Sequence, residues 1–204
     1  MMSTVEKQPK KRNLSRRRIL DAAFVVLDEQ GLDGMTLRSI AQKLDVQAPA
    51  LYRHFKNKDE VLIEMAQLLV DEWSAACALI VHSDWKPWLT ECCTMLRRVV
   101  RGHRDGPRLF MAYHSYAQTS LTRDIMTMLS DQGFAPADII PSVSTLTSFV
   151  VGFTLEEDFE RRTEPIAELK MAEGIDPVFL VYTHDYDLQF DYGVARIIEG
   201  IARR

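Results

Sequence analysis

The sequence predicts an all-α protein, on three observations. Apolar residues recur at helical spacing along most of the chain. One such stripe, typical of a helix with one buried face, is Ile19, Ala22, Ala23, Val26 and Leu27. Sustained period-two alternation is missing, and a brief candidate strand at 178–182 has no second strand to pair with. At 204 residues, with 47% hydrophobic and 26% charged residues, the chain can bury an ordinary globular core.

Capping residues, glycines and prolines place the individual helices. Ser15 can cap the first helix and Gly31 can end it, while Thr36 can cap the second. Pro49 suits the first turn of a third helix, and Asn57 predicts a capped start for a long fourth helix. The expected helices are 16–30, 36–44, 47–54, 57–81, 88–101, 107–116, 121–131, 141–159 and 187–202, with a short one at 165–172.

Cysteine use and hydropathy predict a cytoplasmic protein. Three cysteines form no disulfide framework, which suits a reducing compartment. Cys92 and Cys93 could form a redox switch, but small apolar filler is the favoured interpretation. No uninterrupted apolar run reaches the roughly 20 residues of a membrane-spanning helix, and no signal-peptide core follows the basic N-terminus.

The net charge of −4 hides a strong asymmetry. Residues 1–60 carry 12 Lys and Arg against 8 Asp and Glu, a net charge of +4, and the other residues carry 13 against 21, a net charge of −8. A basic N-terminal part on an acidic remainder favours a polyanion as the partner of the N-terminal part. A soluble disordered tail would give the same pattern.

Residues 36–54 have the pattern of a helix-turn-helix. Ala41 is small enough for a close helix crossing, and Asp45 tolerates the left-handed backbone that such a turn needs. The apolar corner of the motif is formed by Ile40, Leu44, Val46 and Leu51. In such a motif the second helix enters the major groove of DNA. A plain helical hairpin is the alternative, but the basic arm and the preceding amphipathic helix favour DNA binding.

The side chains of this segment suit contacts with DNA. Ala48, Pro49 and Ala50 permit close approach and can touch thymine methyl groups. Lys56 and Lys58, with the amides at the start of the next helix, can hold phosphates. The remaining candidates lie at the two ends of the second helix: Gln47, Tyr52, Arg53 and His54.

From about residue 16 to residue 69 the chain resembles the DNA-binding domain of the TetR family of transcriptional repressors. The motifs that match are ILDAA at 19–23, GLDGMT at 31–36, Ile40, Ala41, Leu44 and LYRHFKNK at 51–58. Asp45 departs from the Gly usual in the family. The remainder is similar, more weakly, to the tetracycline repressor subfamily. Its motifs are HRDG at 103–106, QGF at 132–134, FVVGFTLE at 149–156 and Gly193.

The resemblance implies a homodimer that binds a palindromic operator and a small-molecule effector. It divides the chain into a basic flexible arm (1–13), a helix-turn-helix domain (14–60), and a helical ligand-binding and dimerisation domain (61–204). By position, the family's DNA contacts fall on Thr36, Arg38, Ala48, Pro49, Ala50, Tyr52, His54 and Lys58. Arg38 is the best candidate for a bidentate guanine contact.

The resemblance also implies that the last two long helices form the dimer interface. Two apolar stripes agree with this implication. One stripe is Leu146, Phe149, Val150 and Phe153, and the other is Phe190, Val194, Ile197, Ile198 and Ile201. The sequence leaves open the alternative that both stripes face the protomer's own core.

The ligand pocket is where the sequence departs from the family. Tetracycline repressors bind a drug–magnesium chelate, and the position of their metal-ligating His is Phe110 here. The position of their drug-binding Asn is Cys92, a drug-contacting His is replaced by Ser74, and only Glu156 keeps its carboxylate. Phe110 offers no lone pair to a hard cation. We therefore predict no cofactor, no magnesium site and no recognition of tetracycline.

The pocket that we expect has apolar walls and a few polar groups, as is usual for small-molecule sites. It suggests a hydrophobic or aromatic ligand, although each residue alone could be plain core. The candidates are Trp85, Trp88, Cys92, Leu96, Phe110, Tyr113, His114, Met126, Phe149, Phe153 and Glu156.

The leading interpretation is a ligand-responsive transcriptional repressor that its effector releases from the operator. A regulator that activates, or that answers a protein partner, is the first alternative. An all-helical ligand-binding protein or enzyme is the second. Catalysis has no support, because the sequence carries no His-x-x-x-His pair, no Gly-x-Ser-x-Gly motif and no phosphate loop.

Overall fold

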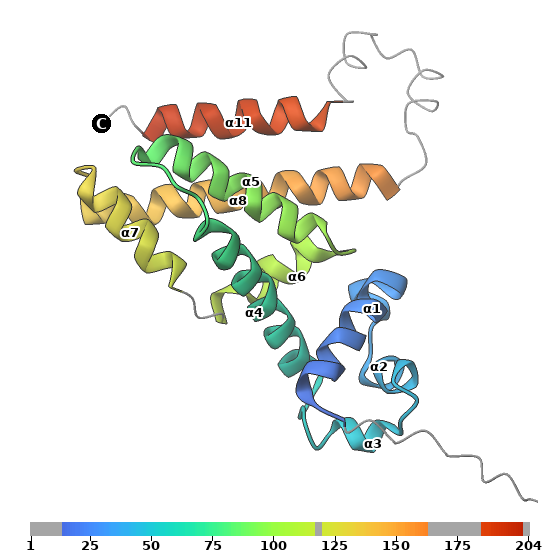
Figure 1. Cartoon of the computed structure of the whole chain (residues 1–204). Helices are drawn as coiled ribbons and strands as arrows, with labels where there is room; N and C mark the ends of the chain where they lie inside the picture. The colour runs from blue at the N-terminus through green and yellow to red at the C-terminus, as the bar shows by residue number, and fades with distance from the viewer. Residues whose placement is uncertain (1–13, 117–119, 163–184, 202–204) are drawn as a thin grey trace, which may run out of the picture.

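The structure confirms the all-α class. The computed structural model describes residues 14–116, 120–162 and 185–201, and every regular element in these ranges is a helix. Figure 1 shows a small group of N-terminal helices, joined by the long helix α4 to a larger bundle. The predicted arm (1–13), the short helix at 165–172 and the candidate strand at 178–182 lie outside the described residues.

Local signals define the starts of the N-terminal helices as the sequence predicted. These helices are α1 (Arg16–Gly34), α2 (Leu37–Lys43) and α3 (Ala48–Leu51), although α3 ends at Leu51 and not near His54. Ser15 caps α1, and the helical path of α1 breaks at Gly31, where φ is +74°. Thr36 caps α2 in a reciprocal capping box with Ser39. Pro49 lies in the first turn of α3, where its missing N–H leaves no carbonyl unpaired.

These three helices and the start of α4 (Lys58–Cys77) enclose a continuous apolar core. Its largest fully buried side chains are Ile19, Leu27, Met35, Ile40, Leu51 and Phe55. Burial of each such side chain contributes roughly 1.5–3 kcal/mol. The core therefore holds the short α3 against α1 and α4 even though α3 has little helical stability of its own.

The helix α4 connects the N-terminal helices to the larger bundle, since it contacts α1 near its start and α5 and α6 further along. Asn57 caps it by accepting a hydrogen bond from the Glu60 amide at 2.9 Å. The Glu60 carboxylate accepts from the Lys56 amide at 2.6 Å, one residue before the cap. The helix ends at Cys77 and not near Val81 as predicted, because Val81 is 92% exposed and has no core to face.

The larger bundle is arranged around α8. Its elements are α5 (Trp85–Arg101), α6 (Gly106–Tyr113), the 3-10 turn η1 (His114–Tyr116), α7 (Leu121–Asp131), α8 (Pro136–Arg162) and α11 (Tyr186–Ile201). The helix α8 packs against α5, α6, α7 and α11. In Figure 1, α5, α8 and α11 lie side by side, and α6 lies between them and the N-terminal helices.

Two helices begin earlier than the sequence predicted, because in each a proline near the start was misinterpreted. Asp84 caps α5, so Pro87 lies in the first turn, where it breaks no hydrogen bond. The helix α8 begins at Pro136 and contains Pro141 in its second turn. Both Pro136 and Pro141 suit a helix start, and α8 begins at the first of them.

The helix α8 is long and apolar enough to cross a membrane by length and composition, contrary to the expectation from the sequence. The serines and threonines that interrupt its apolar run lower its hydropathy only slightly. One such helix is weak support for a membrane span, because the core helix of a soluble protein passes the same test. Here the most apolar window of α8 is 33% buried, and α8 packs against four neighbouring helices and buries Ser142, Thr154 and Glu157.

Candidate nucleic-acid interface and ligand cavity

The turn between α2 and α3 has the predicted geometry. Asp45 lies in the left-handed region with φ +54°, and the Val46 amide donates to the Ala41 carbonyl at 3.0 Å. Ala41 is buried at the crossing of the two helices, where a larger side chain would separate them. The turn thus fixes α3 relative to α2 and leaves the outer face of α3 open to a partner.

The structure places the predicted DNA-contacting residues on one segment of the surface, from the cap of α2 to the first residue of α4. The exposed members are Thr36, Arg38, Gln47, Pro49, Tyr52, Arg53 and Lys56. The partly exposed members are Ala48, Ala50, His54 and Lys58. Tyr52 is 58% exposed, which is typical of an amphipathic side chain at a contact surface. Their contacts with DNA stay a prediction.

Lys58 has a structural contact in addition to its predicted one. Its ammonium group donates to the Leu32 carbonyl at 2.8 Å and also faces Asp33 electrostatically. An ammonium group has three donors, so this bond leaves capacity for a phosphate. Lys58 therefore also joins the start of α4 to the end of α1.

A polar junction joins the end of α1 to the turn between α5 and α6. Asp105, in the left-handed region with φ +56°, accepts from the Leu32 amide at 2.8 Å. Arg108 makes two parallel hydrogen bonds to Asp33, each of 3.0 Å. These bonds from Arg108 lower the pKa of Asp33, which is therefore held in its charged form.

Further contacts extend this junction along α1. Asp28 accepts from the Arg104 amide at 3.0 Å and lies 3.2 Å from Nδ1 of His103. The His103 ring packs on Phe24, with ring centroids 4.4 Å apart. Arg104 also donates to the Glu29 carbonyl at 3.2 Å. The α5–α6 turn therefore contacts two turns of α1.

A cavity of about 360 Å³ lies between α4, α6, α7 and α8. Its apolar wall is formed by Trp73, Met111, Leu121, Ile125, Met126, Ile139, Ile140 and Val143. Hydroxyl groups come from Thr122, Ser144, Thr147 and Ser148. His114 is the one ionisable side chain among the described residues that line it. The arrangement suits an uncharged, largely apolar molecule with a polar edge.

The hydrogen bonding of His114 determines what it offers to this cavity. Its Nδ1 lies 3.1 Å from the Phe110 carbonyl, which can only accept, so Nδ1 carries the proton. Nε2 is then left as an acceptor in the neutral ring. The Phe110 ring stacks on His114 at 4.9 Å, with an interplanar angle of 4°, and so fixes its orientation.

Only some of the predicted ligand contacts meet at this cavity. His114 and Met126 line it, and Phe110 lies behind His114. Cys92 and Leu96 line a neighbouring cavity of only about 20 Å³, which shares part of its wall with the larger one.

The other predicted ligand contacts line neither cavity: Trp85, Trp88, Tyr113, Phe149, Phe153 and Glu156. Trp85 packs edge-on against Phe134 at 4.9 Å. Phe149 and Phe153 lie on the opposite side of α8, with ring centroids 6.0 and 5.6 Å from Phe190. Helical periodicity identifies an apolar face but does not say which neighbour covers it.

The polar edge of the cavity was not predicted from the sequence. Ser144, Thr147 and Ser148 follow one another at helical spacing and face it from α8. That spacing, within an otherwise apolar segment, was a signal that could have identified them. Trp73 was also missed, because its position in the apolar stripe of α4 is that of any core residue.

Metal ligands are not grouped in the described part of the chain, where no cluster of three or more His, Cys, Asp or Glu could hold an ion. Phe110 is 1% exposed and presents only carbon. The expectation that the chain binds no magnesium chelate stays a prediction.

Most of the predicted dimer-interface residues belong to the protomer's own core, which corrects their assignment. Five are at most 4% exposed in the single chain: Leu146, Val150, Phe190, Val194 and Ile198. Ile197 and Ile201 are partly buried against the same core. The apolar side chains left exposed on α8 and α11 include Leu155, Phe159, Leu188 and Tyr192. Each helix has two apolar faces, and the residues predicted from periodicity lie on the face that is buried within the protomer.

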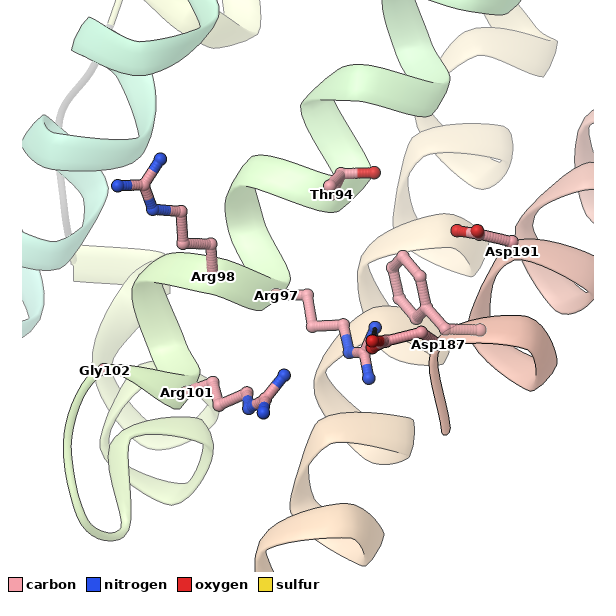
Figure 2. Close-up of a pocket in the computed structure, with 8 residues that line it drawn as sticks. Thr94, Arg97, Arg98, Arg101, Gly102, Asp187 and Asp191 are labelled. Atoms are coloured by element: carbon pink, nitrogen blue, oxygen red, sulfur yellow. Dashed lines mark ion pairs between the residues drawn. The ribbon is translucent and has the colours of Figure 1, made fainter. Parts of the chain in front are cut away.

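A second, more open pocket of about 540 Å³ lies between α5 and α11 (Figure 2). Arg97 bonds Glu157 at 3.0 Å and Asp187 at 2.8 Å. Arg101 lies 3.4 Å from Glu157, whereas Figure 2 shows Arg98 directed away from this group. Arg161 also pairs with Glu157 at 2.7 Å, so three guanidinium groups (Arg97, Arg101 and Arg161) face the two carboxylates of Glu157 and Asp187.

Comparisons with known proteins agree with this geometry. Residues 19–65 match the family model for bacterial regulatory proteins of the tetR family, and residues 81–204 match the tetracyclin repressor-like, C-terminal domain. The tetracycline repressor protein class C of Escherichia coli is 30% identical over 200 residues, covering 93% of this chain and 91% of the repressor.

Solved structures give the same result. A possible TetR family transcriptional regulator from Streptomyces coelicolor A3(2) has a TM-score of 0.81 at 29% identity, over 92% of this chain and 98% of that one. A single-residue variant of TetR from Acinetobacter baumannii AYE, in complex with minocycline, has a TM-score of 0.77 at 26% identity, over 94% and 98%. BioQ with its double-stranded DNA operator has a TM-score of 0.68 at 26% identity, over 94% and 100%. The chain therefore belongs to the TetR family and is a transcriptional regulator, not an enzyme.

Proposed function

We propose that this chain is a repressor that binds a palindromic operator as a homodimer and is released by a small, uncharged, largely apolar effector. In this proposal residues 1–13 are a basic flexible arm, 14–60 bind DNA, and 61–204 bind the effector and dimerise. Soluble DNA-binding regulators of this family are typically cytoplasmic, and we expect the same here. The observation that carries the proposal is that one helix, α6, contacts both the ligand cavity and the N-terminal helices.

The helix α6 is short enough to act as a rigid lever. Near its start, Asp105 and Arg108 hold the end of α1. At its other end, Met111 lines the cavity and His114 follows directly. The helix has eight residues, a rise of about 12 Å, and so it moves as one body. A ligand that displaces Met111 or His114 therefore also moves the α1 contact.

A second connection runs through α4. Its first residue, Lys58, bonds the Leu32 carbonyl in the N-terminal helices, and its Trp73 lines the cavity. An effector that shifts both α4 and α6 changes the separation of the two DNA-binding units of a dimer. Half-sites on DNA repeat at one helical turn of about 34 Å, so a changed separation weakens operator binding.

The proposed dimer uses the outer faces of α8 and α11. Leu155 and Phe159 of α8 are 39% and 65% exposed, and Leu188 and Tyr192 of α11 are both 67% exposed. Such a set of exposed apolar side chains favours a protein–protein contact. The operator complex of BioQ and the minocycline complex of the Acinetobacter repressor support the proposed partners.

The proposal is tested by binding the protein to DNA from upstream of its own coding sequence. We expect a shifted complex with this duplex and weaker binding to a random duplex of the same length. Uncharged aromatic compounds that raise the melting temperature would then be titrated calorimetrically with and without the duplex. Because coupling is reciprocal, the DNA must weaken ligand binding by the factor by which ligand weakens DNA binding. Equal ligand affinities in the two titrations would refute the release mechanism.

Arg38 is expected to read a base. Arg38→Ala should lower the affinity for the upstream duplex by on the order of 1–3 kcal/mol and relax specificity at one base pair. Lys56→Ala is the matched control, since Lys56 is exposed and would meet only phosphates. It should weaken binding to both duplexes alike and reduce the slope of log affinity against log salt by about one. An equal loss on both duplexes for Arg38→Ala would exclude base reading.

Tetracycline with magnesium is expected to leave the protein–DNA complex intact. Phe110 offers only carbon atoms and stacks behind His114. The hydroxyl groups that line the cavity are neutral ligands, which bind Mg²⁺ weakly. A gel shift with micromolar tetracycline and millimolar magnesium measures this. Release of the duplex under these conditions would contradict the prediction, and fluorescence of the added drug would show whether it binds.

A further inference from the structure

We infer that Arg16 is a positioning residue for DNA binding: it braces the turn after α3 against α1 and α4 without itself contacting DNA. The inference rests on the proposed function of the N-terminal helices.

Arg16 stands at the first position of α1 and connects three elements. One Nη atom donates to the His54 carbonyl in the turn after α3. The other lies 3.1 Å from Glu60 and also bonds Glu64, while Nε lies 3.3 Å from Glu64. All three nitrogens of the guanidinium thus bond protein acceptors. The charge of Arg16 is opposed by two carboxylates, Glu60 and Glu64, which disfavours its use in a phosphate contact.

Packing fixes the same guanidinium from its flat side. Its central carbon lies 4.2 Å from the ring centroid of Phe55, and Phe55 is fully buried in the core of the N-terminal helices. The hydrogen bonds that Arg16 donates to Glu64 and Glu60 raise its pKa, so the group stays charged. Arg16 is therefore held in one geometry although its side chain is 43% exposed.

The segment that Arg16 braces is otherwise held by backbone hydrogen bonds and by the buried Leu51 and Phe55. The helix α3 has four residues, and the turn after it is held by the bonds from the His54 and Phe55 amides to the Leu51 carbonyl, at 2.8 and 2.9 Å. This turn and its flanks carry four predicted DNA contacts: Tyr52, Arg53, His54 and Lys56. Without the bond to its carbonyl, the turn can adopt other geometries, and each lowers the fraction of protein ready to bind DNA.

The size of the expected effect depends on the fraction of the variant protein in which the turn after α3 keeps the geometry that binds DNA. If the released turn keeps its geometry for about a tenth of the time, the apparent Kd for the operator rises about tenfold. Binding to random DNA depends on charge and tolerates altered geometry. The diagnostic is therefore the ratio of the affinity for the upstream duplex to the affinity for the random duplex. A general loss of stability lowers the amount of folded protein but leaves this ratio unchanged.

The first test compares Arg16→Lys with the matched control Arg17→Ala. Arg17 is 71% exposed and pairs with Asp21 on its own helix. Arg16→Lys keeps the charge but cannot reach one carbonyl and two carboxylates together. We expect Arg16→Lys to lower the affinity ratio about tenfold with an unchanged salt slope, and Arg17→Ala to match wild type in the ratio. Near-wild-type binding by Arg16→Lys would show that only the charge matters and would overturn the inference.

The second test uses a carboxylate, so that electrostatics and positioning predict opposite signs. Glu64→Ala removes a negative charge beside Arg16, close to the predicted DNA-contacting turn, which by charge alone strengthens binding to DNA. Glu64 is, however, a hydrogen-bond partner of Arg16. Its removal should therefore loosen the contact between Arg16 and the turn after α3, and lower the affinity for the upstream duplex several-fold. Stronger binding to both duplexes would refute the positioning role. Circular dichroism melts of each variant identify any that are not folded.

The outcomes also separate this inference from the function on which it rests. If the wild-type protein fails to bind the upstream duplex in preference to random DNA, the proposed function fails and the inference fails with it. If wild type binds selectively and the Arg16→Lys and Glu64→Ala variants bind equally well, only the inference fails.

Discussion

Glu157→Ala is expected to destabilise the protein by about 3 kcal/mol or more. The carboxylate is 1% exposed and accepts two hydrogen bonds from Arg97, at 3.0 and 3.1 Å. Its other oxygen lies 2.7 Å from Arg161 and 3.4 Å from Arg101. Removing one member of a buried ion pair leaves the other charge without compensation in a low-dielectric site, which costs about 3–5 kcal/mol.

The lower end of this range is expected because Arg97 keeps the bond to Asp187 at 2.8 Å. Urea unfolding of wild type and variant at one protein concentration measures the effect, since dimerisation makes apparent stability depend on concentration. Glu156→Ala is the matched control, because Glu156 is the exposed neighbour on the same helix. A change below about 1 kcal/mol for Glu157→Ala would contradict the prediction.

The consequence for function follows from where Glu157 lies. It connects α8 to α5 through Arg97, and Arg97 in turn contacts Asp187 and the Phe190 ring of α11. The ion pairs therefore hold together the two helices whose outer faces we propose for the dimer. We expect Glu157→Ala to weaken dimerisation along with folding, which analytical ultracentrifugation would detect.

Gly106→Ala is expected to cost about 3 kcal/mol and to weaken DNA binding as well. A Cβ at this position would lie 2.0 Å from the Val100 carbonyl oxygen. Overpacking typically costs about 1–3 kcal/mol, and the upper end applies here because the obstacle is backbone that no rotamer change can move. Gly106 begins α6, so relief of the clash displaces Asp105 and Arg108 from the end of α1.

Gly102→Ala is the control for this prediction, because it alters the same turn without a severe clash. A Cβ there would lie 3.2 Å from the Val99 carbonyl, and the residue has helical φ and ψ of −63° and −17°. We expect its stability to stay within about 0.5 kcal/mol of wild type. If urea unfolding gave both variants the same stability, the clash at Gly106 would be relieved by backbone movement and the rigid junction would be refuted.

The features of the chain that were predictable from the sequence are the local ones. Thr36 as a cap, Asp45 in the left-handed region and the break at Gly31 were all predicted, because each follows from the conformational preference of one residue. The starts of α5 and α8 were wrong, because a proline fits a first turn wherever that turn falls. The placement of α3 followed the motif because its spacing leaves one way to bury Leu51.

The lining of the ligand cavity was less predictable, because it depends on how the helices pack. Phe149 and Phe153 were placed in the pocket with His114, yet they lie on the other side of α8, against Phe190. Leu146 and Val150 were assigned to a dimer interface and instead fill the protomer core. In each case the spacing correctly identified residues of one helix face, but the face itself could be covered by any of four neighbouring helices.

The sequence by itself thus determined the helical class, the helix-turn-helix, the charge asymmetry and the family. These depend on residues close together in the chain, whose preferences and spacings are visible without a fold. Only the tertiary structure decided which side chains line the cavity, that α6 links it to the end of α1, and that Arg16 reaches Glu60, Glu64 and the His54 carbonyl. These contacts join residues 38 to 75 positions apart, and their geometry is set by helix packing, which periodicity does not specify.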